Sequence, residues 1–320
     1  MLPKAHLHVH LEGAMRPSTL QELAADAGIP IPEIRGFGSF SAFAGMYVAA
    51  CQVVRTPAHL RRLVLEVVED AAIDGAVWVE PATYVPHHRE RLGSDEDVLE
   101  IVLDAAAAAA AQFGIGVGVM VAADRTVDPQ DAIEQARLAV RYRDRGVVSF
   151  GLANDEAIGP PEDFAAAFAI AREDGLLSTP HAGELAGPES VLGALDALGA
   201  DRVQHGVRAV EDTELVKRLA DSPVCLDVCP TSNVLLAVVP RLADHPLPTL
   251  LDAGIACSLN ADDPLLFGPN LLEEYELVRR EFDFDDAQMA FIAQCSIDAS
   301  GAPPTLKRET AAEITQWLRD

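Results

Sequence analysis

The feature that most constrains the fold of this chain is the alternation of short β-like runs with longer segments of helical periodicity. Eight runs are predicted as strands, at residues 5–10, 76–81, 115–121, 147–152, 177–181, 202–205, 224–228 and 255–259. The segments between them carry apolar residues at helical spacing, and several begin with a Ser, Thr or Asp-Pro start signal. Eight strands alternating with helices predict a single (β/α)8 TIM barrel that spans residues 1–320.

The rival architecture is an open, doubly wound α/β sheet that binds a dinucleotide. Such a sheet needs a G-x-G-x-x-G loop between a strand and a helix, and no predicted strand is followed by one. The glycines at 114, 116 and 118 lie inside a predicted strand instead. No stretch rich in Pro, Gly or Ser divides the chain. We therefore favour the barrel, as one domain.

Composition excludes several classes of partner. Half of the 320 residues are hydrophobic (49%) and 23% are charged, which is typical of a folded globular chain. Fifty acidic against 24 basic residues give a formal charge of −26, which repels nucleic acids and anionic membranes. Five unevenly spaced cysteines favour buried, reduced thiols, and neither a leader nor a membrane span is predicted. We expect a cytoplasmic protein with a small-molecule substrate; a homo-oligomer is compatible with the sequence.

The segment 29–55, an insertion after the first strand, is predicted to be the longest irregular stretch. It holds Phe37, Phe40, Phe43 and Tyr47, in a chain with only 5% aromatic residues. These rings either pack as core beneath a loop or cover the mouth of the barrel and exclude water from a flat substrate. The sequence leaves both alternatives open.

Ionisable residues gather where four of the predicted strands end. The strand-end residues are His8, His10, His181, Glu184, His205, Asp262 and Asp263. Taken singly, each is more often a core histidine or a helix cap than a functional group. Barrel active sites, however, lie at the carboxyl ends of the strands, so the joint pattern indicates one site. The histidines outside this pattern are interpreted as structural: His59, His87, His88 and His245.

These strand-end motifs resemble those of the adenosine/AMP deaminase family of metal-dependent hydrolases. H-x-H-L-x-G, H-A-G-E, H-G and N-x-D-D-P occur in the order of that family, between residue 4 and about residue 268. The resemblance implies that His8, His10, His181 and Asp262 bind one Zn²⁺ ion per chain, a donor set that suits zinc and leaves a position for water. His6 lies on the same face of the strand, and we expect it to pack inside the barrel.

The family reaction is hydrolysis of the exocyclic amine of a 6-aminopurine. By resemblance, Glu184 donates a proton to N1 and Asp263 holds N7. His205 and Asp262 orient the water and accept its proton. The remaining substrate contacts implied are Glu12, Asn154 and Gly183, and Ser232 and Asn233 are further candidates. None of the three lysines lies near the strand that supplies a bridging lysine in two-metal relatives, which favours a single metal ion.

Three departures from the family pattern leave the substrate open. Adenosine deaminases usually have Asp at position 12, where this chain has Glu12; members that act on adenine also carry Glu, but their Phe-Phe-Asp-Pro-Gln segment is missing. Asn154 replaces a glycine, and Arg89 and Arg91 are either surface residues or partners of a substrate carboxylate. The candidates are adenosine, 2′-deoxyadenosine or 6-aminodeoxyfutalosine, with adenine or a non-purine amine or amide as alternatives.

Overall fold

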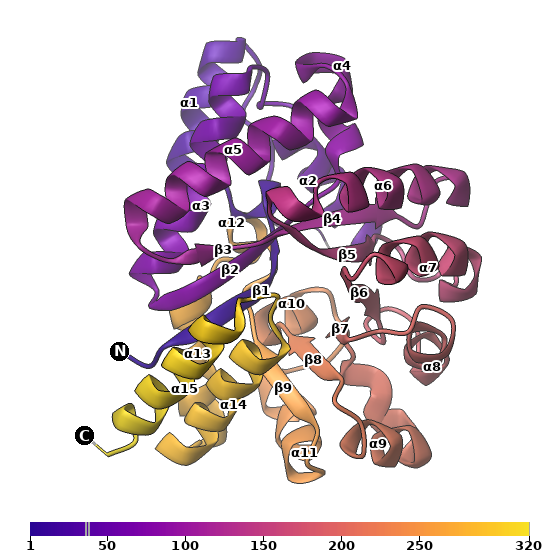
Figure 1. Cartoon of the computed structure of the whole chain (residues 1–320), viewed down its shortest axis with the longest axis vertical. Coiled ribbons are helices and arrows are strands. Elements are labelled where there is room, and N and C mark those ends of the chain that lie inside the picture. The colour runs from indigo at the N-terminus through magenta and orange to yellow at the C-terminus, as the bar shows by residue number, and fades with distance from the viewer. Residues whose placement is uncertain (36, 38, 320) are drawn as a thin grey trace.

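A nearly closed ring of parallel strands, surrounded by helices, forms the molecule (Figure 1). The computed structural model describes residues 1–35, 37 and 39–319. The strands are β1 (Lys4–His10), β2 (Ala76–Thr83), β3 (Gly116–Val117), β4 (Val119–Asp124), β5 (Val147–Ala153), β6 (Leu177–Ala182), β7 (Arg202–His205), β8 (Cys225–Val228) and β9 (Ala256–Leu259). They pair in the order β1-β2-β4-β5-β6-β7-β8-β9, with β3 beside β2. The predicted (β/α)8 barrel is confirmed.

The N-x-D-D-P motif closes the ring between β9 and β1. The backbone N–H of Asp262 donates to the carbonyl of His8, and the N–H of His10 donates to the carbonyl of Asp262, both at 3.0 Å. The side-chain oxygen of Asn260 accepts the N–H of Leu7 at 2.7 Å and that of His8 at 3.0 Å. The Asn260 side chain therefore replaces the backbone carbonyl that a neighbouring strand would offer to β1. The contact between the segment after β9 and β1 places Asp262 beside the histidines of β1.

Helices cover the outside of the ring (Figure 1). They are α1 (Pro17–Ala27), α2 (Phe40–Cys51), α3 (Pro57–Ile73), α4 (Arg89–Leu92), α5 (Asp95–Phe113), α6 (Pro129–Arg141), α7 (Ala165–Glu173), α8 (Pro188–Asp196), α9 (Thr213–Ala220), α10 (Pro230–Leu235), α11 (Leu247–Asp252), α12 (Pro264–Phe267), α13 (Leu271–Phe282), α14 (Asp286–Ala299) and α15 (Pro304–Trp317). The start signals act as expected: Thr56 caps α3, and Ser94 forms a capping box with Asp97 at α5. Within the described part of the chain, no helix has the length and apolarity needed to cross a membrane.

A buried ion triad occupies the barrel interior. The guanidinium of Arg202 donates to Glu80 at 2.7 Å and to Asp227 at 2.9 Å, and all three side chains are inaccessible to solvent. Ser258 donates to Asp227, and the Trp78 indole donates to Glu80, both at 2.7 Å. These bonds tie β2, β7, β8 and β9 together below the site.

Two predictions of local structure need correction. The predicted strand 115–121 is split into β3 and β4, and β4 continues to Asp124. The glycines there serve packing, because a Cβ at Gly116 or Gly118 would overlap the Trp78 ring. The segment 29–55 is not irregular throughout, because α2 begins after Ser39, which accepts the N–H of Ala42.

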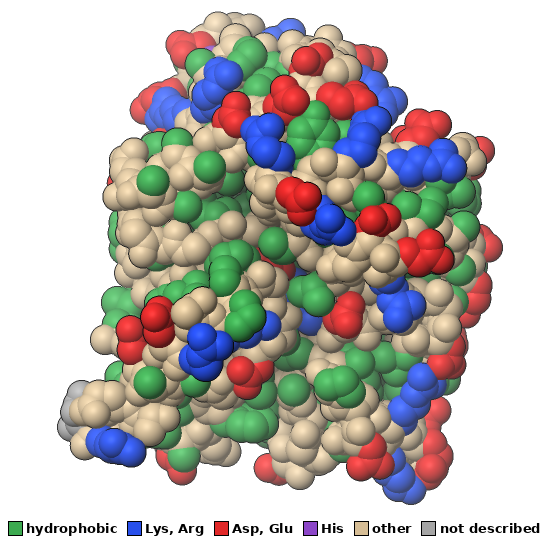
Figure 2. Space-filling model, in the orientation of Figure 1, with side chains coloured by type: hydrophobic (Ala, Val, Ile, Leu, Met, Phe, Trp, Pro, Cys, Tyr) green, Lys and Arg blue, Asp and Glu red, His purple; other side chains and the backbone are tan. Residues whose placement is uncertain are grey.

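Acidic and basic side chains are interspersed over the face drawn in Figure 2, and no broad blue surface is present on that face. The five cysteines all carry free, buried thiols, as their spacing predicts.

Candidate functional site

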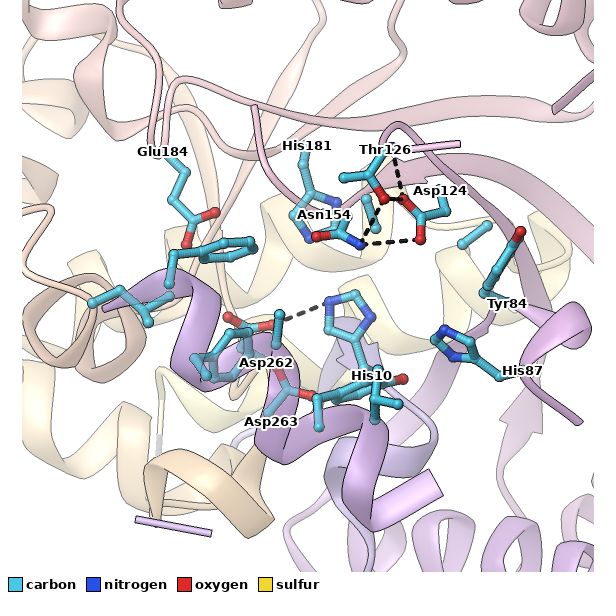
Figure 3. A pocket seen from close by; sticks show the side chains of 18 of the residues that line it. His10, Tyr84, His87, Asp124, Thr126, Asn154, His181, Glu184, Asp262 and Asp263 are labelled. Atoms are coloured by element: carbon cyan, nitrogen blue, oxygen red, sulfur yellow. Dashed lines mark hydrogen bonds and ion pairs between the residues drawn. The ribbon is translucent and has the colours of Figure 1, made fainter. Parts of the chain in front are cut away.

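A cavity of about 340 Å³ lies at the carboxyl ends of the strands (Figure 3). Its wall includes most of the predicted site residues: His10, Asn154, His181, Glu184, His205, Asp262 and Asp263. The helix α2 supplies a wall of apolar and aromatic side chains, among them Phe40, Phe43 and Tyr47. The core alternative holds for Phe43, which stacks on buried Phe267. The same helix also lines the cavity.

Donor atoms that suit a metal ion converge on Asp262. Its Oδ1 lies 3.3 Å from Nε2 of His8 and 3.2 Å from Nε2 of His10. Donor atoms of His8, His181, His205 and Asp262 all lie within 4.8 Å of one another, and His10 forms an overlapping group with Asp262 and Asp263. The four predicted ligands are therefore brought together, although His205 lies as close as they do.

Hydrogen bonds on the outer nitrogens of two histidines leave their inner nitrogens free to bind an ion. Nδ1 of His8 lies 3.0 Å from the carbonyl of Asp227, and Nδ1 of His181 lies 2.9 Å from the carbonyl of Leu152. A carbonyl only accepts, so Nδ1 carries a proton in both rings, and Nε2 is the nitrogen that can bind an ion when the ring is neutral. Nε2 of His8 is buried, and its near neighbour among the described residues is Oδ1 of Asp262, so the pair can hold one ion between them.

A chain of hydrogen bonds assigns the opposite tautomer to His205. The backbone N–H of Leu247 donates to Nδ1 of His245 at 3.1 Å, so His245 carries its proton on Nε2 and donates to Asn233 at 3.1 Å. The amide of Asn233 then donates to Nδ1 of His205 at 3.1 Å. Nε2 of His205 consequently carries a proton and faces Glu184 at 3.4 Å. In this state His205 is a donor toward the pocket and has no lone pair there for a metal ion.

Two adjacent carboxylates of the site differ in protonation. Burial opposes ionisation of Asp262, but His8 and His10 hold its pKa well below the ordinary value. Burial and the charge of Asp262 raise the pKa of Asp263 well above its ordinary value. These opposite pKa shifts favour an ionised Asp262 and a protonated Asp263, a division expected where two like charges share one cavity. Gly13 makes room for this arrangement, because a Cβ there would overlap the Asp263 side chain.

Three site residues adopt left-handed backbone conformations that side chains rarely take. The φ angles are 82° for Asn154, 66° for His205 and 59° for Asp262. Each follows or ends a strand of the barrel, where the chain turns so that the side chain lines the pocket. Such strain is typical of functional positions, where the surrounding structure holds it in place.

Glu184 lies in a loop that a second carboxylate holds. Oε2 of Glu156 accepts the backbone N–H groups of Glu184, Leu185 and Ala186 at 2.8, 2.5 and 3.0 Å. Oε1 accepts the N–H of Gly183 at 2.8 Å and the hydroxyl of Ser190 at 2.6 Å. Burial raises the pKa of Glu184 well above its ordinary value, and nearby carboxylates raise it further. This pKa shift favours the protonated form of Glu184, which lines the pocket and is suited to proton donation in that form.

Two predicted substrate contacts do not line the pocket among the described residues, namely Glu12 and Gly183. Glu12 is fully buried and accepts hydrogen bonds from Tyr47 and Thr83 at 2.7 and 3.2 Å, with His88 at 2.7 Å. Burial would raise its pKa, but His88 and Tyr47 lower it to about 2. Any effect of Glu12 on a ligand thus passes through Tyr47, which does line the pocket.

Several residues that support or line the site were not singled out by their sequence pattern. Tyr84, His87, Asp124 and Thr126 line the pocket, and His88 holds Glu12. The predicted strands ended three residues too early at 121 and two too early at 81, so Asp124 and Tyr84 were not recognised as strand-end residues. Ser232 and Asn233 lie behind the pocket wall, where Ser232 donates to Asp262 at 2.7 Å.

The two arginines considered for a substrate carboxylate have other partners. Arg89 is half-exposed and pairs with Asp95 at 2.7 Å. Arg91 donates to the carbonyls of His87 and Val54 at 2.6 and 3.0 Å. Neither lines the described pocket. His6 is buried and accepts the N–H of Ala261 at 3.2 Å. It lines a second cavity together with Val67 and Ala71 of α3, so the expectation that it packs inside the barrel with His8 is not met.

Comparison with curated proteins gives close relatives that match over nearly their full lengths. A "Putative adenosine/adenine deaminase" of Streptomyces virginiae is 47% identical and covers 99% of this chain and 97% of its own length. An "Aminodeoxyfutalosine deaminase" of Streptomyces avermitilis is 37% identical and covers 99% and 91%.

Solved structures agree with these relatives. The adenine deaminase of Arthrobacter aurescens superposes with a TM-score of 0.94 at 31% identity and covers all of both chains. An amidohydrolase of Burkholderia ambifaria, solved with bound Zn, superposes with a TM-score of 0.91 at 30% identity, over 99% of this chain and 92% of its own. The family model described as adenosine deaminase matches residues 3–317. The chain is therefore a member of the adenosine deaminase family, a hydrolase that acts on a purine amine.

Proposed function

We propose that this protein catalyses the hydrolytic deamination of a 6-aminopurine nucleoside to the 6-oxo product and ammonia. Adenosine, 2′-deoxyadenosine and 6-aminodeoxyfutalosine are the candidate substrates. The observation that carries the proposal is the convergence, in one pocket, of the carboxyl groups of Glu184 and Asp262 with the imidazoles of β1 and β6. Family membership supports the reaction class. The free, buried thiols fit a reducing compartment, and we place the enzyme in the cytoplasm.

One Zn²⁺ ion is proposed to bind His8, His10, His181 and Asp262. The donor set fits, because the protonated Nδ1 atoms of His8 and His181 leave Nε2 as the donor and Nε2 of His8 faces Oδ1 of Asp262. Bound there, the ion would supply a water activated for nucleophilic attack near neutral pH. His205 is not assigned as a ligand, because its tautomer presents N–H.

The side chains of the pocket divide the remaining work. Asp262, an acceptor, takes the proton of the attacking water, and the Nε2–H of His205 orients the oxygen toward C6. Glu184 donates its proton to N1, which makes C6 electrophilic, and the protonated Asp263 donates a hydrogen bond to N7. As the C6–N bond breaks, the amine leaves as ammonia with the proton that Asp262 took from the water. The second proton of the water returns to Glu184 as the hydroxyl on C6 becomes the 6-oxo group. Phe40 and Phe43 cover the ring plane.

The test is the Glu184→Gln variant, which keeps the shape of the side chain and removes its acidic proton. We expect deamination of adenosine to fall by roughly 10²- to 10⁴-fold, with the zinc content of the protein unchanged. Glu211→Gln, an exposed residue outside the pocket, is the control and should keep full activity. Undiminished turnover in the Glu184 variant would contradict the proposed mechanism.

Deamination of free adenine is the second candidate function. It is favoured by the position of Glu12, whose carboxylate is engaged by Tyr47, Thr83 and His88 and does not line the pocket to meet a ribose hydroxyl. Rates of ammonia release from adenine and adenosine, measured in parallel, decide between the two candidates.

A further inference from the structure

The pocket has a second polar region, away from Glu184 and Asp262, that the proposed chemistry does not use. It consists of Asp124, Thr126 and Asn154, which we call the distal polar site (Figure 3). Asp124 accepts the amide of Asn154 at 3.0 Å and the hydroxyl of Thr126 at 2.7 Å. Oδ1 of Asp124 also accepts the backbone N–H of Thr126 at 2.8 Å, so both of its lone pairs are used. Oδ2, which accepts only the Asn154 amide, is left able to accept a further donor from the pocket.

The strand order indicates which part of a purine faces this site. In the proposed binding mode, N1 of the purine lies at Glu184, which follows β6, and N7 lies at Asp263, which follows β9. The edge of the purine opposite C6 then faces the ends of the strands between these two points, namely β5, β4, β2 and β1. Along a purine that edge runs from N1 through N3 and N9 to N7. Asn154, after β5, therefore lies on the N3 side, and Asp124, at the end of β4, lies where the N9 substituent leaves the ring.

The charge of the pocket restricts that substituent. No Lys or Arg lines the cavity in the described part of the chain, whereas four carboxyl groups do: Asp124, Glu184, Asp262 and Asp263. Burial lowers the pKa of His87, so this neighbour is neutral near pH 7. Arg89 and Arg91 are bound elsewhere. An anionic group placed beside Asp124 would meet repulsion with no cation to offset it.

We propose that the distal polar site binds the 2′- and 3′-hydroxyl groups of an uncharged, sugar-like substituent on N9 and selects against substituents that carry phosphate or carboxylate. The cavity of about 340 Å³ falls within the range of pockets, roughly 300–1,000 Å³, that hold ligands larger than a bare ring system. This inference rests on the proposed deamination. Among its candidate substrates it selects neutral nucleosides over 6-aminodeoxyfutalosine, which has a carboxylate.

The experiment pairs one residue with one substrate group. Asp124→Asn keeps the side-chain shape and removes its charge; Asp128→Asn, in the same loop but outside the pocket, is the control. kcat/KM is measured for adenosine, 2′,3′-dideoxyadenosine, adenine and AMP, and binding of inosine and hypoxanthine is measured by calorimetry. We expect Asp124→Asn to lower kcat/KM for adenosine by about tenfold to hundredfold and to leave dideoxyadenosine and adenine within about twofold.

Further outcomes support or overturn the inference separately from the proposed function. The wild type should act on AMP at least about tenfold less efficiently than on adenosine, and Asp124→Asn should narrow that difference. Equal losses for adenosine and dideoxyadenosine, or equal wild-type efficiency on AMP, would overturn the inference. Turnover of adenine but not adenosine, with hypoxanthine bound and inosine not, would overturn it too, while deamination would stand. Failure to turn over or bind any of these purines would instead refute the proposed function.

Discussion

Glu156 is predicted to position the proton donor without touching the substrate. Its carboxylate accepts four consecutive backbone N–H groups, those of residues 183–186, and the hydroxyl of Ser190, with Glu184 in the middle of the held segment. Glu156 does not line the described pocket. The Glu156→Gln variant keeps the size of the side chain but removes its charge and one acceptor, so the loop that carries Glu184 is weakened selectively.

The size of the effect follows from the bonds that the amide keeps. With its oxygen at the Oε2 position, glutamine retains the three hydrogen bonds from the N–H groups of residues 184–186. The contribution of each bond to stability falls from about 1.5–3 kcal/mol, for a charged acceptor, to about 0.5–1.5 kcal/mol, for a neutral one. Its NH₂ group then faces the N–H of Gly183, which loses its partner, while the Ser190 hydroxyl turns to accept. An amide is also less costly to bury than a carboxylate, so the net loss of unfolding free energy should be about 3 kcal/mol.

The catalytic effect should appear in kcat. A displacement of Glu184 of the order of 1 Å costs up to about 100-fold in rate, so we expect kcat for the preferred purine to fall about 10- to 100-fold. The metal content should not change, because the ligands of the ion lie outside this loop. The assay is steady-state ammonia release per zinc-loaded site, together with urea unfolding monitored by circular dichroism.

Glu189→Gln is the matched control. Glu189 lies in the same region and caps one N–H, that of Gly187, at 3.1 Å, so its variant should change stability by less than about 1 kcal/mol and leave kcat intact. If Glu156→Gln unfolds earlier but retains full kcat per zinc-loaded site, Glu156 stabilises the loop without positioning Glu184. If stability and kcat both stay at the wild-type values, the reasoning from these hydrogen bonds is refuted.

Three other predictions follow from buried groups and from the ion. Arg202→Met should cost about 3–5 kcal/mol of unfolding free energy in urea, because it leaves the charges of Glu80 and Asp227 buried and unpaired; an unchanged midpoint would contradict this. Burial lowers the pKa of His245 to about 4 in the folded protein, below its value of about 6.5 in the unfolded chain. As the pH falls, the unfolded chain therefore takes up the proton first. The contribution of His245 to the free energy of unfolding is fully present above pH 6.5 and is lost as the pH falls toward 4. The stability difference between wild type and His245→Asn should therefore shrink by up to about 3 kcal/mol over that interval, whereas His59→Asn, partly exposed, should show no such change. Chelation should abolish ammonia release and lower the Tm, and one equivalent of Zn²⁺ should restore both; full activity after complete removal of metal would exclude the zinc proposal.

The elements that the sequence predicted correctly are those with strong local patterns. The strand at 202–205 is found with the predicted bounds, because a short segment between two helical segments has few alternatives in an alternating β/α chain. The helix α2 was missed because its apolar residues, enclosed between the pocket and Phe267, surround the helix and show no amphipathic period. Tyr84 and Asp124 were missed because strand ends depend on pairing with a neighbouring strand.

The sequence by itself determined the alternation of strands and helices and the residue types at the strand ends. Those features are local, since side-chain period and start signals act over a few residues. The tertiary structure alone decided which partner each polar group meets. Glu12 is held by His88, Asn260 closes the ring on β1, and Asn233 sets the tautomer of His205. These contacts join segments separated by up to 253 residues, and hydrogen bonds require distances and angles that only the packed barrel defines.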